Sequence, residues 1–348
     1  MKNILKRFLI GAISCSATAF AAPTPWNGTA DISWYESSAQ AYNLINAEQL
    51  AGLAKLVNEG TSDFAGKTIT LGADIFLNDT TGADAGSWYN ASHRSWTPIG
   101  TTSRPFKGEF DGIAGKKNRK IYGLYINNSS ANYAGLFGYT SNVKISNLDV
   151  LVGRVSAKNN VGALVGYADG GSITNVHTEV RVNGNNRVGG LVGNFTGNIS
   201  KSSGKGNVVG RDSVGGLAGV TTGAIAGTSA SKSNFVGNVE GRKFVGGVVG
   251  SGNSIQYVYS EATVKGDSNY VGGIAGFASG KVMNSYHING SVNGNSFVGG
   301  LVGEVQDIVS GSYFTGNVVA KGDFVGGLIG KSIYTRSSTS DVYTLRNS

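Results

Sequence analysis

The chain has 348 residues, and glycine accounts for 55 of them, more than twice its usual share of about 7%. Because the apolar fraction is an ordinary 40% and only 4 residues are proline, collagen-like and disordered chains are excluded, and strands and turns are favoured over helices. The formal net charge of +8 is scattered along the chain, without the Lys/Arg-rich block that marks a nucleic-acid-binding surface.

The first 22 residues are predicted to be a signal peptide. Three basic residues precede a mostly apolar run from Phe8 to Ala19, and Ala19-Phe20-Ala21 forms an A-x-A-like cleavage site. The run is too short to span a bilayer, which favours cleavage after Ala21 over an N-terminal anchor. Cleavage would also remove Cys15, the only cysteine, leaving no disulfide and no thiol nucleophile. We therefore expect a secreted or cell-surface protein whose mature chain has no integral membrane span.

Residues Asn46 to Asn58 are the one good helix candidate. Asn46 is a suitable N-cap with Gln49 three residues later, and the apolar residues that follow share one helix face: Leu50, Leu53, Ala54 and Val57. The next apolar segments, 68–71 and 74–77, alternate like strands. We expect the helix to cover the open end of the fold that follows, and a separate binding domain is the alternative.

One hexapeptide recurs eight times in the last two-thirds of the chain. The copies read from YAGLFG to VGGLIG and begin at Tyr133, Val161, Val188, Val214, Val245, Val271, Val298 and Val325. Their intervals are 26 to 28 residues, except for 31 residues between Val214 and Val245, where Thr221 to Ser231 is predicted to be a loop insertion. A fixed period of this length is typical of a repeat architecture.

Each repeat also carries two further short apolar runs, such as Ile173–Val176 and Val180–Val182, before a small-residue turn. A unit with about three short strands cannot bury its own apolar face, but stacked units can. The sequence therefore predicts an all-β parallel β-helix or β-solenoid, with one coil of about 27 residues per repeat and successive coils about 4.8 Å apart. Glycines at the second and last places of the hexapeptide, as at Gly189 and Gly193, would leave room for the neighbouring coils.

The expected organisation has four parts: a signal peptide (1–22), an N-terminal segment with the capping helix (23–67), leading coils (68–132), and eight repeat coils with a C-terminal strand (133–348). No second cap is visible after the last repeat. Either the strand-like segment 341–345 closes the last coil, or the C-terminal coil supports end-to-end self-association.

The VGGLVG-type copies at about 27-residue spacing resemble the GLUG motif. That motif occurs in large exported bacterial surface proteins and in accessory regions of some IgA-specific metallopeptidases. The resemblance covers Tyr133 to Gly330, and the segments Trp96–Gly100, Phe106–Gly112 and Ile121–Leu124 are similar to the coils that lead into such repeats. It implies a β-solenoid with an adhesin-like role, and it implies no shared reaction.

Most catalytic motifs are absent from the sequence. His93, His177 and His287 are far apart, none lies in H-E-x-x-H, and no G-x-S-x-G elbow occurs. The segment 326–332 resembles a P-loop, but Val325 stands where that motif needs glycine. A C-x-x-C metal pattern is impossible with one cysteine. We therefore predict no catalytic residue, no metal site and no cofactor.

A polysaccharide lyase on a β-helix would need clustered carboxylates beside a basic residue. Two places before each hexapeptide, from the second copy on, stand Asn159, Asn186, Asp212, Lys243, Asn269, Ser296 and Asp323. The asparagines of this column are more typical of a ladder of turns. The loop residues Asp74, Asp79 and Asp84 could bind a cation, but such loops usually bind only water.

Aromatic residues align in two rows. The place immediately before the hexapeptide holds Asn132, Asn160, Arg187 and Ser213 in the first four copies and Phe244, Tyr270, Phe297 and Phe324 in the last four. A second row holds Tyr259, Tyr286 and Tyr313, with His177 roughly aligned to it. Either row could stabilise consecutive coils from inside, or form an exposed stripe that binds sugar rings or apolar groups of a partner. Alternation does not decide between them, because both faces of the hexapeptide carry apolar residues.

These observations predict an exported, non-enzymatic β-solenoid protein that acts in adhesion or binding, with a polysaccharide or a host or partner surface as its target and no nucleic acid. One alternative is a carbohydrate-active enzyme of the polysaccharide lyase type. The other is a structural spacer or assembly subunit.

Overall fold

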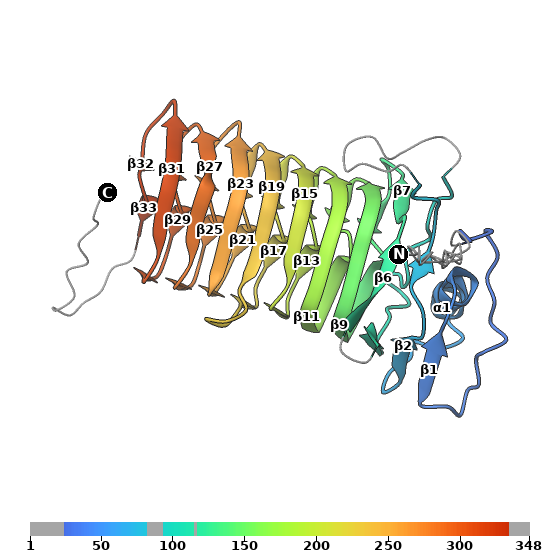
Figure 1. The fold of residues 1–348 in the computed structure, drawn as a ribbon. Coiled ribbons are helices and arrows are strands. Elements are labelled where there is room, and N and C mark those ends of the chain that lie inside the picture. The colour runs from blue at the N-terminus through green and yellow to red at the C-terminus, as the bar shows by residue number, and fades with distance from the viewer. Residues whose placement is uncertain (1–23, 82–92, 115–116, 334–348) are drawn as a thin grey trace, which may run out of the picture.

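The computed structural model describes residues 24–81, 93–114 and 117–333. It is all-β, with 56% of its residues in strands, and forms a parallel β-solenoid of about ten turns with one short helix near the N-terminus (Figure 1). The predicted fold class is confirmed. The expected signal peptide, Asp84 and the strand-like segment 341–345 lie outside the described residues.

The N-terminal end contains the predicted helix and the first parallel strands. Strand β1 (Ala41–Leu44) precedes helix α1 (Ala47–Glu59), which is followed by β2 (Thr68–Leu71) and β3 (Ile75–Phe76). As predicted, Asn46 caps the helix: its Oδ1 accepts a hydrogen bond from the Gln49 N–H at 2.9 Å. The apolar face of α1 is buried in the same core as the first coils, and Figure 1 places the helix at the N-terminal end of the stack. Because β1 pairs with β2, the parallel sheet already begins before the helix.

The leading coils contain β4 (Glu109–Asp111), β5 (Ile113–Ala114), β6 (Lys117–Tyr122) and β7 (Tyr125–Asn127). The first half of each hexapeptide lies in a separate eight-stranded sheet: β8 (Asn132–Ala134), β10 (Asn159–Val161), β12 (Asn186–Gly189), β16 (Asp212–Gly215), β20 (Lys243–Gly246), β24 (Val271–Gly272), β28 (Val298–Gly299) and β32 (Val325–Gly326). We number the repeat coils one to eight in this order.

The rest of each coil joins a second, continuous sheet. In coils one and two it forms the long strands β9 (Phe137–Ser156) and β11 (Val165–Asn183). In later coils the second half of the hexapeptide forms β13 (Val192–Phe195), β17 (Ala218–Thr221), β21 (Val249–Gly252), β25 (Ala275–Ala278), β29 (Val302–Val305) and β33 (Ile329–Ser332). A two- or three-residue strand follows: β14 (Asn198–Ser200), β18 (Ile225–Ala226), β22 (Ile255–Gln256), β26 (Val282–Met283) and β30 (Val309–Ser310). A longer strand ends the coil: β15 (Ser203–Val209), β19 (Ser233–Gly241), β23 (Val258–Gly266), β27 (Tyr286–Gly294) and β31 (Tyr313–Ala320).

A sharp bend divides the hexapeptide, so these later coils have four strand segments where the sequence predicted about three. In coil three the bend directly follows β12 and lies at Gly190 and Leu191, where a Cβ atom on Gly190 would overlap the carbonyl oxygen of Gly216 in the next coil. In and beside the bend, Val188, Leu191 and Val192 are fully buried. The first, fourth and fifth places of the hexapeptide therefore build the core of the coil.

The first hexapeptide aligns differently from the sequence prediction. Ala134 pairs with Val161, and Asn132 pairs with Asn159, so Tyr133 stands at the place immediately before the hexapeptide. The assignment of Asn132 to that place is wrong, because this copy is one residue shorter than the others. An insertion is present as predicted, but its five extra residues lie within 227–232, between β18 and β19. Thr221 and Ile225–Ala226, which the prediction assigned to the loop, belong to strands β17 and β18.

The described residues leave the C-terminal end of the stack open. The side chains of Val319, at the end of coil seven, and Val325, in coil eight, are 55% and 48% exposed, whereas Val298, one coil before Val325, is fully buried. The last coil is exposed because no further coil among the described residues pairs with it. Self-association through this end stays a prediction.

Candidate binding edge of the solenoid

Four aromatic residues form one continuous row along the solenoid. The ring centroids of Phe244, Tyr270, Phe297 and Phe324 follow one another at 4.7, 4.8 and 4.7 Å, with angles between ring planes of 15°, 15° and 10°. The spacing is that of parallel strands in a sheet. The predicted stacking of these rings is therefore confirmed, and we call the row the aromatic ladder.

The aromatic ladder lies on the outside of the coils. Phe244, Tyr270 and Phe297 are half-buried, and Phe324 is 54% exposed. The next residue in each coil, for example Val245, points into the core instead. Because the rings stack on one another, they cover much of one another's faces and present mainly their edges to solvent.

An unusual backbone conformation sets the direction of these side chains. All four ladder residues are left-handed, with φ between 55° and 66°, and so are Tyr133, Asn160, Arg187 and Ser213 at the same place in coils one to four. For a residue other than glycine this conformation costs about 1–2 kcal/mol. The neighbouring coil packs closely against this left-handed residue. A Cβ on Gly276 would lie 2.6 Å from the Val245 nitrogen and 2.7 Å from the Phe244 carbonyl carbon. The coils are thus closely packed at the left-handed residue whose side chain points outward.

Two lysines lie over the aromatic ladder. The Lys243 ammonium is 4.7 Å from the ring centroid of Phe244 and 5.4 Å from that of Tyr270. Lys331 lies 5.3 and 5.6 Å from the centroids of Phe297 and Phe324. Such distances are within the range of cation–π attraction. The edge of the solenoid here combines aromatic carbon with positive charge.

The same edge is polar in coils one to four. The Asn159 amide donates to Asn132 Oδ1 at 2.9 Å, and the Asn186 amide donates to Asn159 Oδ1 at 2.9 Å. These bonds form a ladder of asparagine side chains, but the residues lie in the paired strands β8, β10 and β12 and not in the turns that the sequence had indicated. In the next coil Asp212 accepts two bonds from the guanidinium of Arg242, at 3.0 and 2.8 Å. We call the whole row, from Asn132 and Tyr133 to Phe324, the binding edge.

The second aromatic row also exists. The centroids of Tyr259 and Tyr286 are 5.2 Å apart and those of Tyr286 and Tyr313 are 5.0 Å apart, with nearly parallel rings. Strand register places His177 in this column, through Ser203 and Asn234. Tyr259 and Tyr286 are half-buried, and burial raises the pKa of both hydroxyls.

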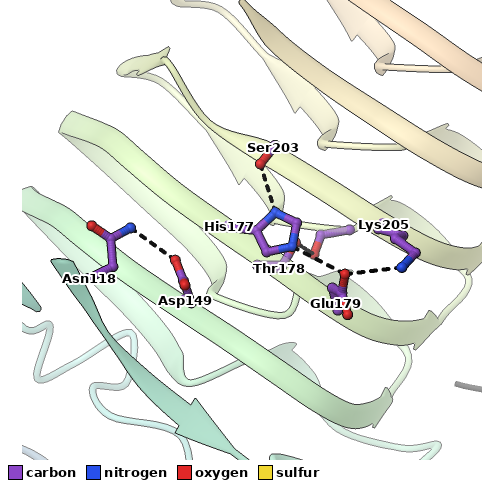
Figure 2. A network of polar contacts seen from close by, with 8 residues as sticks. Asn118, Asp149, His177, Thr178, Glu179, Ser203 and Lys205 are labelled. Atoms are coloured by element: carbon purple, nitrogen blue, oxygen red, sulfur yellow. Dashed lines mark hydrogen bonds and ion pairs between the residues drawn. The ribbon is translucent and has the colours of Figure 1, made fainter. Parts of the chain in front are cut away.

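His177 takes part in a polar network on the sheet surface (Figure 2). Its Nδ1 lies 2.7 Å from Ser203 Oγ, and its Nε2 lies 3.5 Å from Glu179 Oε1, which also accepts a bond from Lys205 at 3.2 Å. A serine, a histidine and a carboxylate are thus neighbours. Strand β15, which carries Ser203, is paired on both sides, so its backbone N–H groups serve the sheet and are not available to an oxyanion. We interpret the network as polar surface contacts that join the neighbouring strands β11 and β15, and not as a catalytic site.

The three histidines do not meet. His287 is fully buried in coil six, and burial lowers its pKa to about 4. His93 lies in the leading coils, where burial lowers its pKa also. The described residues contain no group of three His, Cys, Asp or Glu side chains that could hold a metal ion. Asp74 accepts a backbone hydrogen bond from Lys120 at 3.1 Å.

Sequence reasoning found both rows but missed three parts of this edge. It misplaced Tyr133, it did not connect Lys331 with the aromatic ladder, and it did not find the Tyr139 and Tyr167 rings, which stack at 4.7 Å beside Tyr133. Tyr139 follows the first hexapeptide by one residue, and Tyr167 follows the second in the same way. Aligning the residue after each copy would have found this pair.

Comparisons with known proteins agree with the fold. Residues 158–183 match the family model described as the GLUG motif. Halomucin from Haloquadratum walsbyi (strain DSM 16790 / HBSQ001) is 34% identical over 172 residues, which are 49% of this chain and 2% of halomucin, so the chain spans only a small part of that relative. A crystal structure of a candidate immunoglobulin A1 protease from Bacteroides ovatus is similar with a TM-score of 0.52 and 18% identity, over 84% of each chain. This structural likeness extends to the fold alone.

No helix in the described part of the chain is both long and apolar enough to cross a membrane. The family match covers coil two, the hexapeptide recurs in the seven other coils, and the coils stack in parallel. The chain is therefore a GLUG-repeat β-solenoid protein.

Proposed function

We propose that this protein is exported to the cell surface or its surroundings and acts there as a non-enzymatic binding protein, attaching to an extended polysaccharide along the binding edge. The aromatic ladder is the observation that carries the proposal. Its ring edges form a continuous apolar stripe on the outside of four successive coils, and hydrogen-bonding side chains continue the same edge. A sugar polymer has matching apolar C–H and hydroxyl groups.

The repetition of the coils supports binding to a polymer. Eight coils at about 4.8 Å give a binding edge of about 35 Å, and each coil can make a similar weak contact. Several weak contacts on one rigid body together give a high overall affinity, because after the first contact forms the others are intramolecular. Adhesion to a long, regular target is the function that this geometry serves best.

Two features argue against the other functions. A lyase-type enzyme would need clustered carboxylates beside a base, but the two acidic residues of the edge, Asp212 and Asp323, are four coils apart, and Arg242 pairs with Asp212. A pure spacer has no use for aromatic side chains on its outer surface at backbone positions that favour glycine or asparagine, where Phe244 and Tyr270 stand.

The test compares two double variants on a panel of insoluble polysaccharides. Tyr270→Ala/Phe297→Ala interrupts the aromatic ladder, and Tyr259→Ala/Tyr286→Ala interrupts the second row by the same number of stacked rings. We expect the purified chain and the second-row variant to be retained on at least one polysaccharide, and the ladder variant to be lost from it. Circular dichroism spectra of all three proteins check that the fold is intact.

The same samples are assayed for reducing ends and unsaturated products. Product release would contradict the non-enzymatic assignment. Equal retention of both variants would contradict the role of the ladder, and selective loss in Tyr259→Ala/Tyr286→Ala would move the binding surface to the second row. Absence of retention on every polymer would refute polysaccharide binding.

A further inference from the structure

We infer that the polar half of the binding edge, in coils one to four, recognises carboxylate groups of a uronate-containing polysaccharide. The inference rests on the proposed function, and it names the class of polymer. It is carried by an open cavity on the edge, by a buried amide oxygen without a partner in that cavity, and by two cations that no carboxylate neutralises.

An open cavity of about 450 Å³ lies on the edge in coils one to four, before the first ring of the aromatic ladder. Its lining comes from the two columns of the binding edge: Asn132, Tyr133, Asn159, Asn160, Arg187 and Asp212, with Asn186 and Ser213. All eight of these side chains carry hydrogen-bonding groups, so the cavity suits a hydroxylated ligand. The stacked rings of Tyr139 and Tyr167 lie beside Tyr133 at one end, and the aromatic ladder follows at the other.

Asn160 is the residue of this cavity whose hydrogen bonding is incomplete. Its side chain is only 5% exposed, and its Oδ1 has no hydrogen-bond partner among the described residues. An unsatisfied buried acceptor costs about 1–3 kcal/mol. Because Asn160 lines the cavity, rotation of its amide would offer the oxygen to a sugar hydroxyl, whose donated bond would recover this energy.

Charge on the binding edge favours an anionic polymer. No carboxylate of the described residues lies within 4 Å of the Arg187 guanidinium or the Lys243 ammonium. Asp212, which stands between them in the stack, contacts two guanidinium groups, those of Arg211 and Arg242. The surplus is therefore positive, and the planar guanidinium of Arg187 matches a carboxylate in shape and charge.

The spacing of the two cations fits a polymer that follows the solenoid axis. Arg187 lies in coil three and Lys243 in coil five, about 10 Å apart along the stack. One pyranose residue is similar in length to one coil step, so a uronate chain places a carboxylate near each cation while its rings pass along the polar cavity and the ladder. A neutral polymer would leave both cations without a carboxylate partner.

The test uses sodium polygalacturonate and its methyl ester, which keeps the sugar rings and removes their charge. Arg187→Gln/Lys243→Gln removes the two unpaired cations. Lys205→Gln/Lys265→Gln removes two cations from another face, where they pair with Glu179 and Glu240, and changes the net charge equally. Binding is measured by isothermal titration calorimetry at low and physiological salt.

We expect the unaltered chain and the Lys205→Gln/Lys265→Gln control to bind polygalacturonate, and Arg187→Gln/Lys243→Gln to bind it about tenfold more weakly. Binding to the ester should be weaker and the same for all three proteins. Asn160→Leu, which keeps the volume and removes the amide, should weaken binding to both polymers.

Equal weakening in both double variants would show only unspecific attraction between charges and would overturn the inference. Equal affinity of the unaltered chain for the acid and the ester would overturn it too. In that case, loss of binding in Tyr270→Ala/Phe297→Ala would leave the proposed function standing. Absence of binding to either polymer would overturn the uronate inference. The proposed function would then still be tested by retention on the panel of insoluble polysaccharides.

Discussion

Replacing His287 by phenylalanine is expected to remove a large part of the acid sensitivity of the solenoid. The imidazole is fully buried, stacks on Phe314 with centroids 5.5 Å apart, and neither ring nitrogen has a hydrogen-bond partner among the described residues. Burial disfavours the charged ring and lowers its pKa from 6.5 to about 4, an effect that the nearby Ser260 backbone only partly offsets.

The sign and size follow from proton linkage. The unfolded chain takes up a proton at His287 near pH 6.5, and the folded chain does so only near pH 4. The neutral ring's contribution to stability is therefore complete above pH 6.5 and is lost as the pH falls through this window. At 1.36 kcal/mol per pKa unit, the loss between pH 7 and pH 4 is about 3 kcal/mol.

The repeat itself shows that phenylalanine fits this place. Strand register aligns Phe235, Ser260, His287 and Phe314 in one interior column. The Phe235 ring packs against Gly216, as the His287 ring packs against Gly273. The substitution thus keeps the packing and removes only the titrating group and its unsatisfied nitrogens.

Urea unfolding at several values between pH 4 and pH 7 measures the effect for the unaltered chain, for His287→Phe and for His177→Gln. His177 is the control, because its side chain is 32% exposed on the sheet surface. We expect the pH dependence to shrink by about 3 kcal/mol in His287→Phe alone. If the unaltered chain and His287→Phe lose the same stability over this window, the reasoning on the buried ring is refuted.

Four further substitutions test separate parts of the coil. Phe297→Ala should lower stability by about 1 kcal/mol in urea unfolding, because the ring is half-buried, and a loss of 3 kcal/mol or more would instead indicate a core ring. Ser285→Ala should cost about 1–3 kcal/mol, because Ser285 Oγ accepts the buried Val258 N–H at 3.2 Å, whereas Ser260→Ala, at a buried hydroxyl without a partner, should cost little. Equal costs would contradict this assignment. Gly276→Ala should lower the melting temperature strongly, and an unchanged value would refute the close approach of coils at the left-handed residue.

The coil architecture could be predicted because the same short pattern of glycine and buried apolar residues recurs in every coil. Glycine recurs where the backbones of neighbouring coils approach, and Val188, Leu191 and Val192 mark the buried places in one copy as their equivalents do in the others. The helix was also predictable, because Asn46 supplies the oxygen that caps it. Strand β1 was not, since its four residues show no signal without β2, the strand with which they pair.

The direction of the aromatic ladder could not be predicted from alternation. Alternation assumes an extended strand, in which successive side chains point to opposite faces. Phe244 instead has a left-handed backbone, and the hexapeptide bends at Gly247 and Val248, directly after β20, so the period of two is broken on both sides of Val245. The first copy was misaligned for a related reason. It has one residue fewer between Ala134 and Phe137, and the sequence alone does not show at which position of the bend the residue is missing.

The binding edge can differ between coils because it is separate from the core. Within coils two to seven the first place of the hexapeptide is always valine and always fully buried, since each coil must match the next. The place before it points outward, and there the side chain changes from Asn160 and Arg187 to Phe244 and Tyr270 with the same backbone conformation. If this place served only stacking, coils two to four would need rings as much as coils five to seven do. They are instead polar and line a cavity, so stability does not by itself account for the division of the edge.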